Sequence, residues 1–425
     1  MRSRSPEVET VAKKNWGEIV RNNIVTIMFI VLCAVCMAFS GYTPGYVIYE
    51  LFGRLSRNMF IVLALIIPIV AGMGINFAIT IGAMAAQIAC ILVLEWGVQG
   101  FGGFALAAAL TVPMAAVFGF GIGKILNKMK GQEMIGGMIL GYFANGLYQL
   151  LCLFIFDNII PINNPNLTIK GSSGIANTMD LAKGGIAGTL ENLWKLSASQ
   201  AVLVFVLVIA AALVIAHVRS HRKNNKQLIV RLAALAAVAV VMQLPFMVEL
   251  FSMVKIPMAT FIIVALLCVF NLALMKTRLG QQFRAVGQNR TVANAAGINV
   301  DKVRIIAITI STVLAGWGQL IFVQNLGAFQ TYGAHEQVGL YAGAAILVGG
   351  ASVTRATNSQ AILGTVLFHM LFILAPAAAK NLFGDAAIGE YFRVFICYGV
   401  IALALVMHAW SSVAKKKKPS AEKKD

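Results

Sequence analysis

Apolar residues along this chain gather in runs, most of them long enough to cross the ~30 Å hydrocarbon core of a membrane as a helix. The runs fall at about 24–40, 59–74, 76–96, 104–126, 135–156, 198–217, 232–249, 257–275, 305–323, 338–350, 358–379 and 391–410. They predict an all-α fold, a polytopic integral membrane helical bundle of about 10 to 12 spans. Several runs are short or interrupted by glycine, which indicates broken or re-entrant helices.

The overall composition supports a membrane protein rather than a soluble one. Hydrophobic residues make up 59% of the chain and charged residues only 12%, and the mean hydropathy is +0.82. Soluble domains carry about 25% charged residues, so a soluble chain as apolar as this one would have too few polar side chains to cover its surface. Lipid removes that requirement because it solvates apolar side chains directly.

The basic residues lie where a membrane protein is expected to carry them. The net charge is +18, and Lys and Arg residues stand between and beyond the apolar runs, as in the lysine-rich tail that starts at Lys415. If the N-terminus lies inside and the runs alternate, 26 of the 34 Lys and Arg residues fall in inside segments and 8 in outside ones. This asymmetry predicts a multi-pass protein of the bacterial cytoplasmic (inner) membrane with both termini cytoplasmic. It favours contact with anionic membrane lipid over binding of nucleic acid.

Polar segments divide the chain into a cytoplasmic N-terminal segment, a transmembrane domain and a basic cytoplasmic tail, at residues 1–23, 24–410 and 411–425. The N-terminal segment has no cleavage site of a removable signal peptide. The extracytoplasmic loop 157–197 contains proline, asparagine and a Gly/Ser run, with room for a short surface helix. The cytoplasmic loop 276–304 carries an alanine-rich stretch after Thr291, which predicts a short helix ended by Gly297.

Acidic residues stand away from the middle of the predicted spans. None of the 16 falls near the centre of a span, so a proton-driven carrier would lack its usual carboxylate. Sodium binding through backbone carbonyls stays open. The chain is therefore expected to supply a path, with the energy coming from elsewhere.

Motifs for nucleotide hydrolysis and metal chemistry are missing from the sequence. No G-x-x-x-x-G-K-[ST] loop exists, and His335-Glu336 is not part of an H-E-x-x-H. The six cysteines fit small buried apolar positions, without a disulfide framework or a metal site. His369 is the one histidine well inside a predicted span, where it either bonds to a neighbouring helix or serves as a proton relay.

The cytoplasmic loop carries a resemblance to a known family. Its stretch GQQFRAVGQNRTVANAAGINVDKVR, residues 280–304, resembles a loop in permease subunits of bacterial ABC importers, in the group for simple sugars, nucleosides and branched-chain amino acids. The resemblance rests on Arg284, Ala285, Gly287, Asn289, Ala293, Ala296, Gly297 and Ile298. Stretches such as GINFAITIGAMAAQ resemble other parts of the same family, and together the similar regions cover about two-thirds of the chain.

The resemblance implies how the chain is powered. Residues 24–410 would be a transmembrane permease domain whose loop couples to an ATPase through Arg284, Gly287, Asn289, Ala293, Ala296 and Gly297. The short helix of this loop would project into a groove on a cytoplasmic ABC ATPase subunit. ATP and Mg would be used by that partner, and this chain would bind no cofactor or metal. The alternative is a solvated basic loop with no partner.

The resemblance also implies an assembly. A second permease copy or a related permease would complete the transmembrane core, and an extracytoplasmic solute-binding protein would dock on outer loops that include 157–197. In the coupling loop, the basic side chains are expected to meet acidic groups or lipid phosphates; they are Arg284, Arg290, Lys302 and Arg304.

Uncharged polar residues near broken or small-residue backbone are the candidates for a translocation path. They are Asn76, Thr80, Gln87, Asn145, Gln149 and Gln319. Amide and hydroxyl groups suit a simple sugar or a nucleoside, because binding must stay weak enough for release. Each residue has an alternative role in a hydrogen bond between helices. The N-I-G-x-E-G-Q element of nucleoside-type members is missing from 80–87, so the choice between sugar and nucleoside stays open.

The sequence is thus interpreted as the permease subunit of an ATP-driven ABC importer for a small polar solute, and not as an enzyme. An ion-coupled secondary transporter is the alternative, and it predicts an intramembrane carboxylate or inverted repeats. A membrane-embedded enzyme or structural protein would need a convergent set of polar or metal-binding residues, which the spacing does not supply.

Overall fold

The computed structural model of the protein describes residues 23–169, 174–219, 225–385, 387–396, 398–399, 401–402 and 406. The elements in chain order are α2 (Ile24–Ser40), α3 (Pro44–Ala64), α4 (Ile66–Val70), α5 (Ile79–Glu95), α6 (Gly100–Lys128), α7 (Glu133–Leu150), the π-helical turn η1 (Leu151–Ile155), β1 (Thr178–Asp180), α8 (Thr189–Leu193), β2 (Lys195–Ser197), α9 (Ala198–Arg219), α10 (Asn225–Met242), α11 (Pro245–Leu250), β3 (Lys255–Pro257), α12 (Met258–Lys276), α13 (Arg278–Gln288), α14 (Arg290–Ala295), α15 (Val300–Leu326), β4 (Ala328–Gln330), α16 (Val338–Val348) and α17 (Asn358–Phe383). A further helical segment spans 387–396. Of the predicted terminal segments 1–23 and 411–425, every residue except Asn23 lies outside the described residues.

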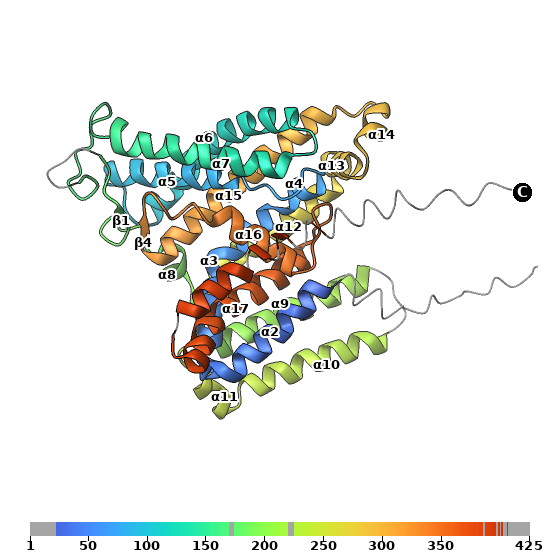
Figure 1. The fold of residues 1–425 in the computed structure, drawn as a ribbon. Helices are drawn as coiled ribbons and strands as arrows, with labels where there is room; N and C mark the ends of the chain where they lie inside the picture. Colours follow the sequence, from blue (N-terminus) through green and yellow to red (C-terminus); the bar gives the residue numbers. More distant parts are fainter. Residues whose placement is uncertain are drawn as a thin grey trace, which may run out of the picture.

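The predicted all-α membrane bundle is confirmed. Within the described ranges, seven helices are long and apolar enough to cross a membrane, and shorter apolar helices include α2, α5 and α16. α15 packs against α6, α5 and α3, whereas α17 packs against α2, α3 and α16. Figure 1 shows these as two groups of helices, with α3 and α16 between them.

The second span was predicted to start at residue 59, and this is wrong. The helix starts at Pro44, about half of its length earlier in the chain. Pro44 opens α3, and the Thr43 hydroxyl caps it by accepting a hydrogen bond from the Tyr46 N–H. The candidate span therefore covers Pro44–Val70, and Arg54 and Arg57, which the charge count had placed outside, lie near its middle. These charged side chains lower the hydropathy of the first half of this span. For that reason the pattern of apolar residues did not predict a helix there.

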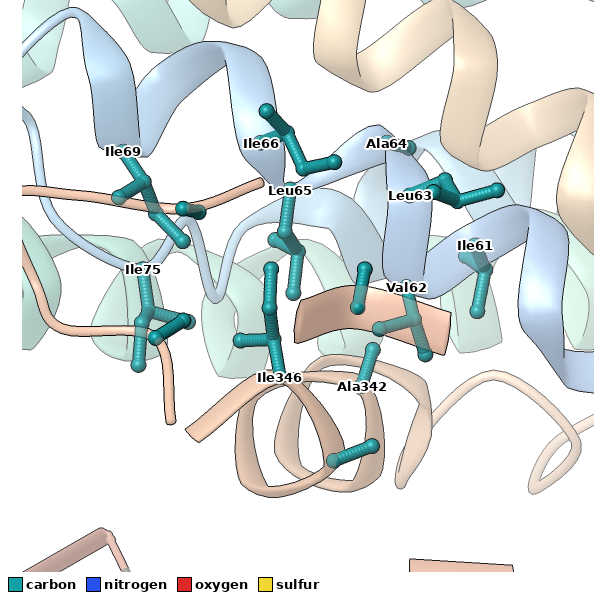
Figure 2. Packing of buried hydrophobic residues seen from close by; sticks show 14 of the residues in the cluster. Ile61, Val62, Leu63, Ala64, Leu65, Ile66, Ile69, Ile75, Ala342 and Ile346 are labelled. Atoms are coloured by element: carbon teal, nitrogen blue, oxygen red, sulfur yellow. The ribbon is translucent and has the colours of Figure 1, made fainter. Parts of the chain in front are cut away.

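The broken span expected around residue 76 is confirmed. Gly72 and Gly74 have φ of 73° and 71°, in the left-handed region that glycine adopts without strain, and they open a stretch of non-helical backbone between α4 and α5. We call residues 71–78 the backbone break. It lies against a dense apolar core, where Figure 2 shows side chains of α3 and α4 facing Ala342 and Ile346 of α16.

The two polar loops form opposite ends of the bundle. Loop 276–304 folds into α13 and α14, and the predicted short helix ended by Gly297 (φ 80°) is confirmed as α14. Loop 157–197 contains the expected short helix, α8, and β1 pairs with β4 in the segment that follows α15. We call these the α14 end and the β1 end, and Figure 1 shows them far apart.

Candidate functional site

A buried charge cluster anchors α14. Glu133, the first residue of α7, accepts from Arg290 of α14 at 2.8 Å and from Arg304 of α15 at 2.5 Å. The Arg304 side chain is fully buried and Glu133 is 7% exposed. We call these three residues the charge cluster. The expectation that the basic side chains meet acidic groups is confirmed for Arg290 and Arg304, and their shared partner is a carboxylate that the sequence placed at a span end.

Loop 276–304 is also tied to the backbone break. Arg290 donates a second hydrogen bond, of 2.8 Å, to the Gly72 carbonyl oxygen. Gly287 of α13 lies so close that an added Cβ would collide with the Val70 carbonyl oxygen, and a Cβ on Gly72 would lie 2.7 Å from the Gly287 Cα. Glycine at both positions allows this approach of two backbones. A displacement of α13 and α14 would therefore press on the end of α4 and on Gly72 of the backbone break.

The outer surface of α14 is open to a partner. Asn289 caps the helix by accepting from the N–H groups of Thr291 and Val292, and Ala293 is the residue that packs inward. Val292 is 63% exposed, and Arg284, Ala296 and Gly297 are exposed as well. The chain itself therefore leaves this face of α14 uncovered.

A hydrogen-bonded group of polar side chains lies beside the middle of α7. His335 places Nδ1 2.9 Å from Gln87 Oε1 and Nε2 2.8 Å from Asn145 Oδ1. Asn145 Nδ2 donates in turn to Glu336 Oε1 at 3.0 Å, and the Tyr148 ring packs edge-to-face on His335. We call Gln87, Asn145, His335 and Glu336 the polar cluster.

The polar cluster can form a directional chain of hydrogen bonds. A neutral imidazole donates one hydrogen bond and accepts one, so one of the two amides must turn its NH₂ group toward the ring. Turning Gln87 achieves this, because its Nε2 atom otherwise has no partner. Donation then runs from Gln87 through His335 and Asn145 to Glu336.

Glu336 changes the expectation about acidic residues. It lies outside every predicted span, yet the loop before α16 enters the bundle and brings it against Asn145, near the middle of the candidate span Glu133–Ile155. The loop thus carries a carboxylate against the middle of a candidate span, where the linear pattern had placed none. An adjacent His-Glu pair in a short segment between apolar helices was the available indication in the sequence.

The other predicted path residues, apart from Gln319, are Thr80, Asn76 and Gln149, and they lie in different surroundings. Thr80 lies between Gly141 of α7 and Gly339 of α16. Asn76 accepts from the Ala78 N–H at 3.1 Å and so shapes the turn that starts α5. The Gln149 side chain is half-buried and makes no hydrogen bond among the described residues.

Gln319 borders both the polar cluster and a cavity. Its Nε2 donates to the Ala334 carbonyl at 3.3 Å, next to His335. On its other side is a cavity of about 100 Å³ between α3, α15, α16 and α17. His369 lines this cavity too, and among the described residues it has no hydrogen bond to a neighbouring helix, so that prediction is wrong. No group of three metal-binding side chains occurs in the described part of the chain.

Comparisons with known proteins show to which family the chain belongs. The family model described as the permease component of branched-chain amino acid transport systems matches residues 47–405. The probable ABC transporter permease protein YphD of Escherichia coli is 33% identical over 161 residues, 38% of this chain and 48% of the relative. The xylose transport system permease protein XylH of Haemophilus influenzae is 28% identical over 158 residues, 37% of this chain and 39% of the relative.

The ribose import permease protein RbsC of Escherichia coli is 33% identical over 132 residues, 31% of this chain and 39% of the relative. The similar regions thus span half or less of the length of these curated relatives. No solved structure matches the chain. Because the family model covers far more than half of the chain, the protein belongs to this family of multi-pass inner-membrane permease components.

Proposed function

We propose that this chain is the membrane-spanning permease subunit of an ATP-driven ABC importer for a small polar solute, with a simple sugar as the first candidate. The observation that carries the proposal is α14, which exposes Val292 at its tip and is anchored to α7, α15 and the backbone break by Arg290 and the charge cluster. Relatives named as xylose and ribose permeases support the choice of a sugar.

α14 is the contact with a cytoplasmic ABC ATPase subunit, which holds ATP and Mg. The exposed surface for this contact includes Arg284, Asn289, Ala296 and Gly297. Ala293 and Gly287 instead pack inward, and they pass a displacement of the loop to the backbone break. Both chain termini lie on the same cytoplasmic side as α14, in keeping with the distribution of Lys and Arg.

The β1 end is the surface for an extracytoplasmic solute-binding protein, and a second permease copy or a related permease completes the core. Between the two ends the solute passes along α5, α7, α15 and α16. The contacts of Thr80, Gln87, Asn145 and Gln319 with these helices and with the loop before α16 support this route.

The route is tested by removing single amides. Asn145→Ala breaks the polar cluster, and the expected result is uptake reduced about tenfold with an unchanged amount of protein in the membrane. Asn76→Ala disturbs the turn before α5 and is expected to have the same effect on uptake. Normal uptake in both variants would remove these residues from the path.

Attachment of the ATPase is tested at the tip of α14. Val292→Glu places a charge where the interface needs an apolar side chain, so we expect the ATPase to be lost on co-purification. Leu193→Glu is the matched control, because Leu193 is 57% exposed on α8 at the opposite end. Equal ATPase recovery with wild type and Val292→Glu would contradict the proposal.

The polar cluster gives one observation in favour of an ion-coupled transporter, since Glu336 and His335 are groups that carry protons in such proteins. The two mechanisms differ in their energy source. Uptake that stops on ATP depletion and persists with an uncoupler supports the importer. The reverse result would establish the ion-coupled alternative.

A further inference from the structure

A cleft at the α14 end has no role in the path described so far. It holds about 790 Å³ between α14, the first turn of α15 and the connection from α6 to α7. The candidate span Gly100–Lys128 ends beside it, and the candidate span Val300–Leu326 begins beside it. The cleft therefore lies at the edge of the membrane, where both lipid headgroups and soluble molecules can reach it.

The basic side chains of this cleft outnumber the acidic groups around them. Lys130, Arg290 and Arg304 line it. The acidic groups are Asp301, which also lines the cleft, and Glu133, which both arginines share. Together these five groups carry one excess positive charge. The chain therefore leaves the cleft without a full complement of negative charge.

Arg304 is the buried part of the cleft wall. Its side chain is fully buried, and its Nη2 atom donates to the Glu133 carboxylate. Its Nε and Nη1 atoms have no acceptor among the described residues. Buried donors without a partner are rare, because they lose their bonds to water and gain no replacement. The charge of Arg304 is thus only partly compensated within the chain, which favours an anion beside it.

The first turn of α15 adds to the attraction for an anion. Val300 and Asp301, its first two residues, line the cleft, and the N-terminus of a long helix presents N–H groups and a positive dipole end. Thr291 and Asn294 of α14 contribute exposed hydroxyl and amide groups to the lining. Guanidinium groups and N–H groups at a helix N-terminus together are typical of a site for phosphate.

The cleft and the proposed ATPase contact lie on different sides of α14. Each residue of an α-helix is turned by about 100° from the one before it, so Asn294 points almost opposite to Val292. Asn294 lines the cleft, whereas the exposed Val292 is not part of its lining. An ATPase that docks on Val292 would therefore leave the cleft to another ligand.

We propose that this cleft binds an anionic phosphate group, with Lys130 and Arg290 as its direct contacts and Arg304 as a buried charge in its wall. A phosphodiester carries one negative charge, which matches the one excess positive charge of the cleft. The group belongs either to the headgroup of an anionic phospholipid or to a free phosphate compound. A phosphate held by both Lys130 and Arg290 would tie α14 to the connection between α6 and α7 and so stiffen the loop that carries α14.

Binding to the full chain in neutral detergent tests the site without an ATPase, and so independently of the importer function. Native mass spectrometry compares phosphatidylglycerol with phosphatidylcholine, and thermal unfolding with added inorganic phosphate tests the soluble source. Phosphatidylglycerol bound at least about fivefold more tightly than phosphatidylcholine supports a lipid headgroup. A higher unfolding temperature with inorganic phosphate supports a free phosphate. Equal binding of the two lipids, together with no effect of inorganic phosphate, would overturn the proposal.

Two lysines near the end of α6 give matched variants. Both are exposed, but Lys130 lines the cleft and Lys128 does not. We expect Lys130→Gln to weaken binding of the preferred ligand about fivefold, and Lys128→Gln to change it by less than about twofold. Equal losses in the two variants would place the anion elsewhere and overturn the site.

Asp301→Asn tests the sign of the charge effect. The substitution removes a negative charge from the cleft wall, so binding of the preferred ligand is expected to tighten about fivefold. The Asn127 side chain donates to the backbone carbonyl of Asp301, a bond that the variant keeps. A merely structural role of this wall predicts no gain in affinity. Unchanged or weaker binding in Asp301→Asn would therefore contradict the site.

Discussion

The charge cluster and the polar cluster satisfy buried polar side chains in different ways. The charge cluster joins α7, α14 and α15 through two ion pairs to one carboxylate, Glu133. The polar cluster joins α5, α7 and the loop before α16 through amides and an imidazole, with its one carboxylate, Glu336, exposed. Buried ion pairs resist separation, whereas neutral hydrogen bonds exchange partners at small cost. The first region is therefore suited to transmit force and the second to rearrange.

The largest difference between the regions is expected from the same substitution made in each. Glu133→Gln leaves two arginines beside a neutral group, one of them fully buried, and should destabilise the protein by about 3–5 kcal/mol. Glu336→Gln removes an exposed charge and keeps an acceptor for Asn145, so its effect should stay below about 1 kcal/mol. Denaturation of both variants in nanodiscs measures this, and equal losses would remove the distinction.

Gly287→Ala tests the contact between α13 and the backbone break. The new methyl group meets the Val70 carbonyl oxygen, a backbone atom that cannot turn away, so we expect a loss of about 3 kcal/mol. Gly121→Ala is the control, since a Cβ there meets nothing within 4 Å. If thermal unfolding of the two variants coincided, the close approach would be refuted.

His335→Phe tests whether the polar cluster depends on its imidazole. The ring size is kept, but Gln87 and Asn145 lose their shared partner, which should destabilise the protein by about 2 kcal/mol and reduce uptake. Tyr148→Phe keeps the ring that packs on His335 and should change stability by less than about 0.5 kcal/mol. A His335→Phe variant with wild-type stability and uptake would count against the cluster.

The smallest effect on stability is expected at the outer surface of α13. Arg284 is exposed, so Arg284→Ala should change the free energy of unfolding by less than about 0.5 kcal/mol. The same variant should weaken ATPase attachment, because the charge belongs to the proposed interface. Stability from denaturation and attachment from co-purification thus report separately on the two roles of this loop.

Much of the fold could be predicted because lipid imposes a simple pattern. The apolar runs predicted most of the helices, and the glycines near Asn76 predicted the backbone break. Helix α14 was predictable because its alanines and Gly297 act locally. The first half of α3 could not be predicted, because Glu50 and the arginines near it are residues typical of a loop. In the structure Glu50 pairs with Arg54, and Arg57 lines a cavity.

The candidate site was predicted only in part for a related reason. Gln87, Asn145 and Gln319 could be chosen as uncharged polar residues within apolar runs, and the structure brings them to one loop. His335 and Glu336 were not chosen, because a re-entrant loop looks like an ordinary connection in the sequence. The pairing of Glu133 with two arginines depends on residues about 160 to 170 positions away, which no local pattern encodes.

The most direct measurement is coupled transport by an Arg290→Met variant, reconstituted with its ATPase and assayed for ATP hydrolysis and solute uptake together. Glu133 keeps Arg304 as a partner in this variant, so the fold is preserved, while the bond to Gly72 is lost. The predicted result is normal ATPase attachment and basal hydrolysis with uptake reduced at least about tenfold. Wild-type uptake at the same hydrolysis rate would contradict the claim that α14 drives the path through the backbone break.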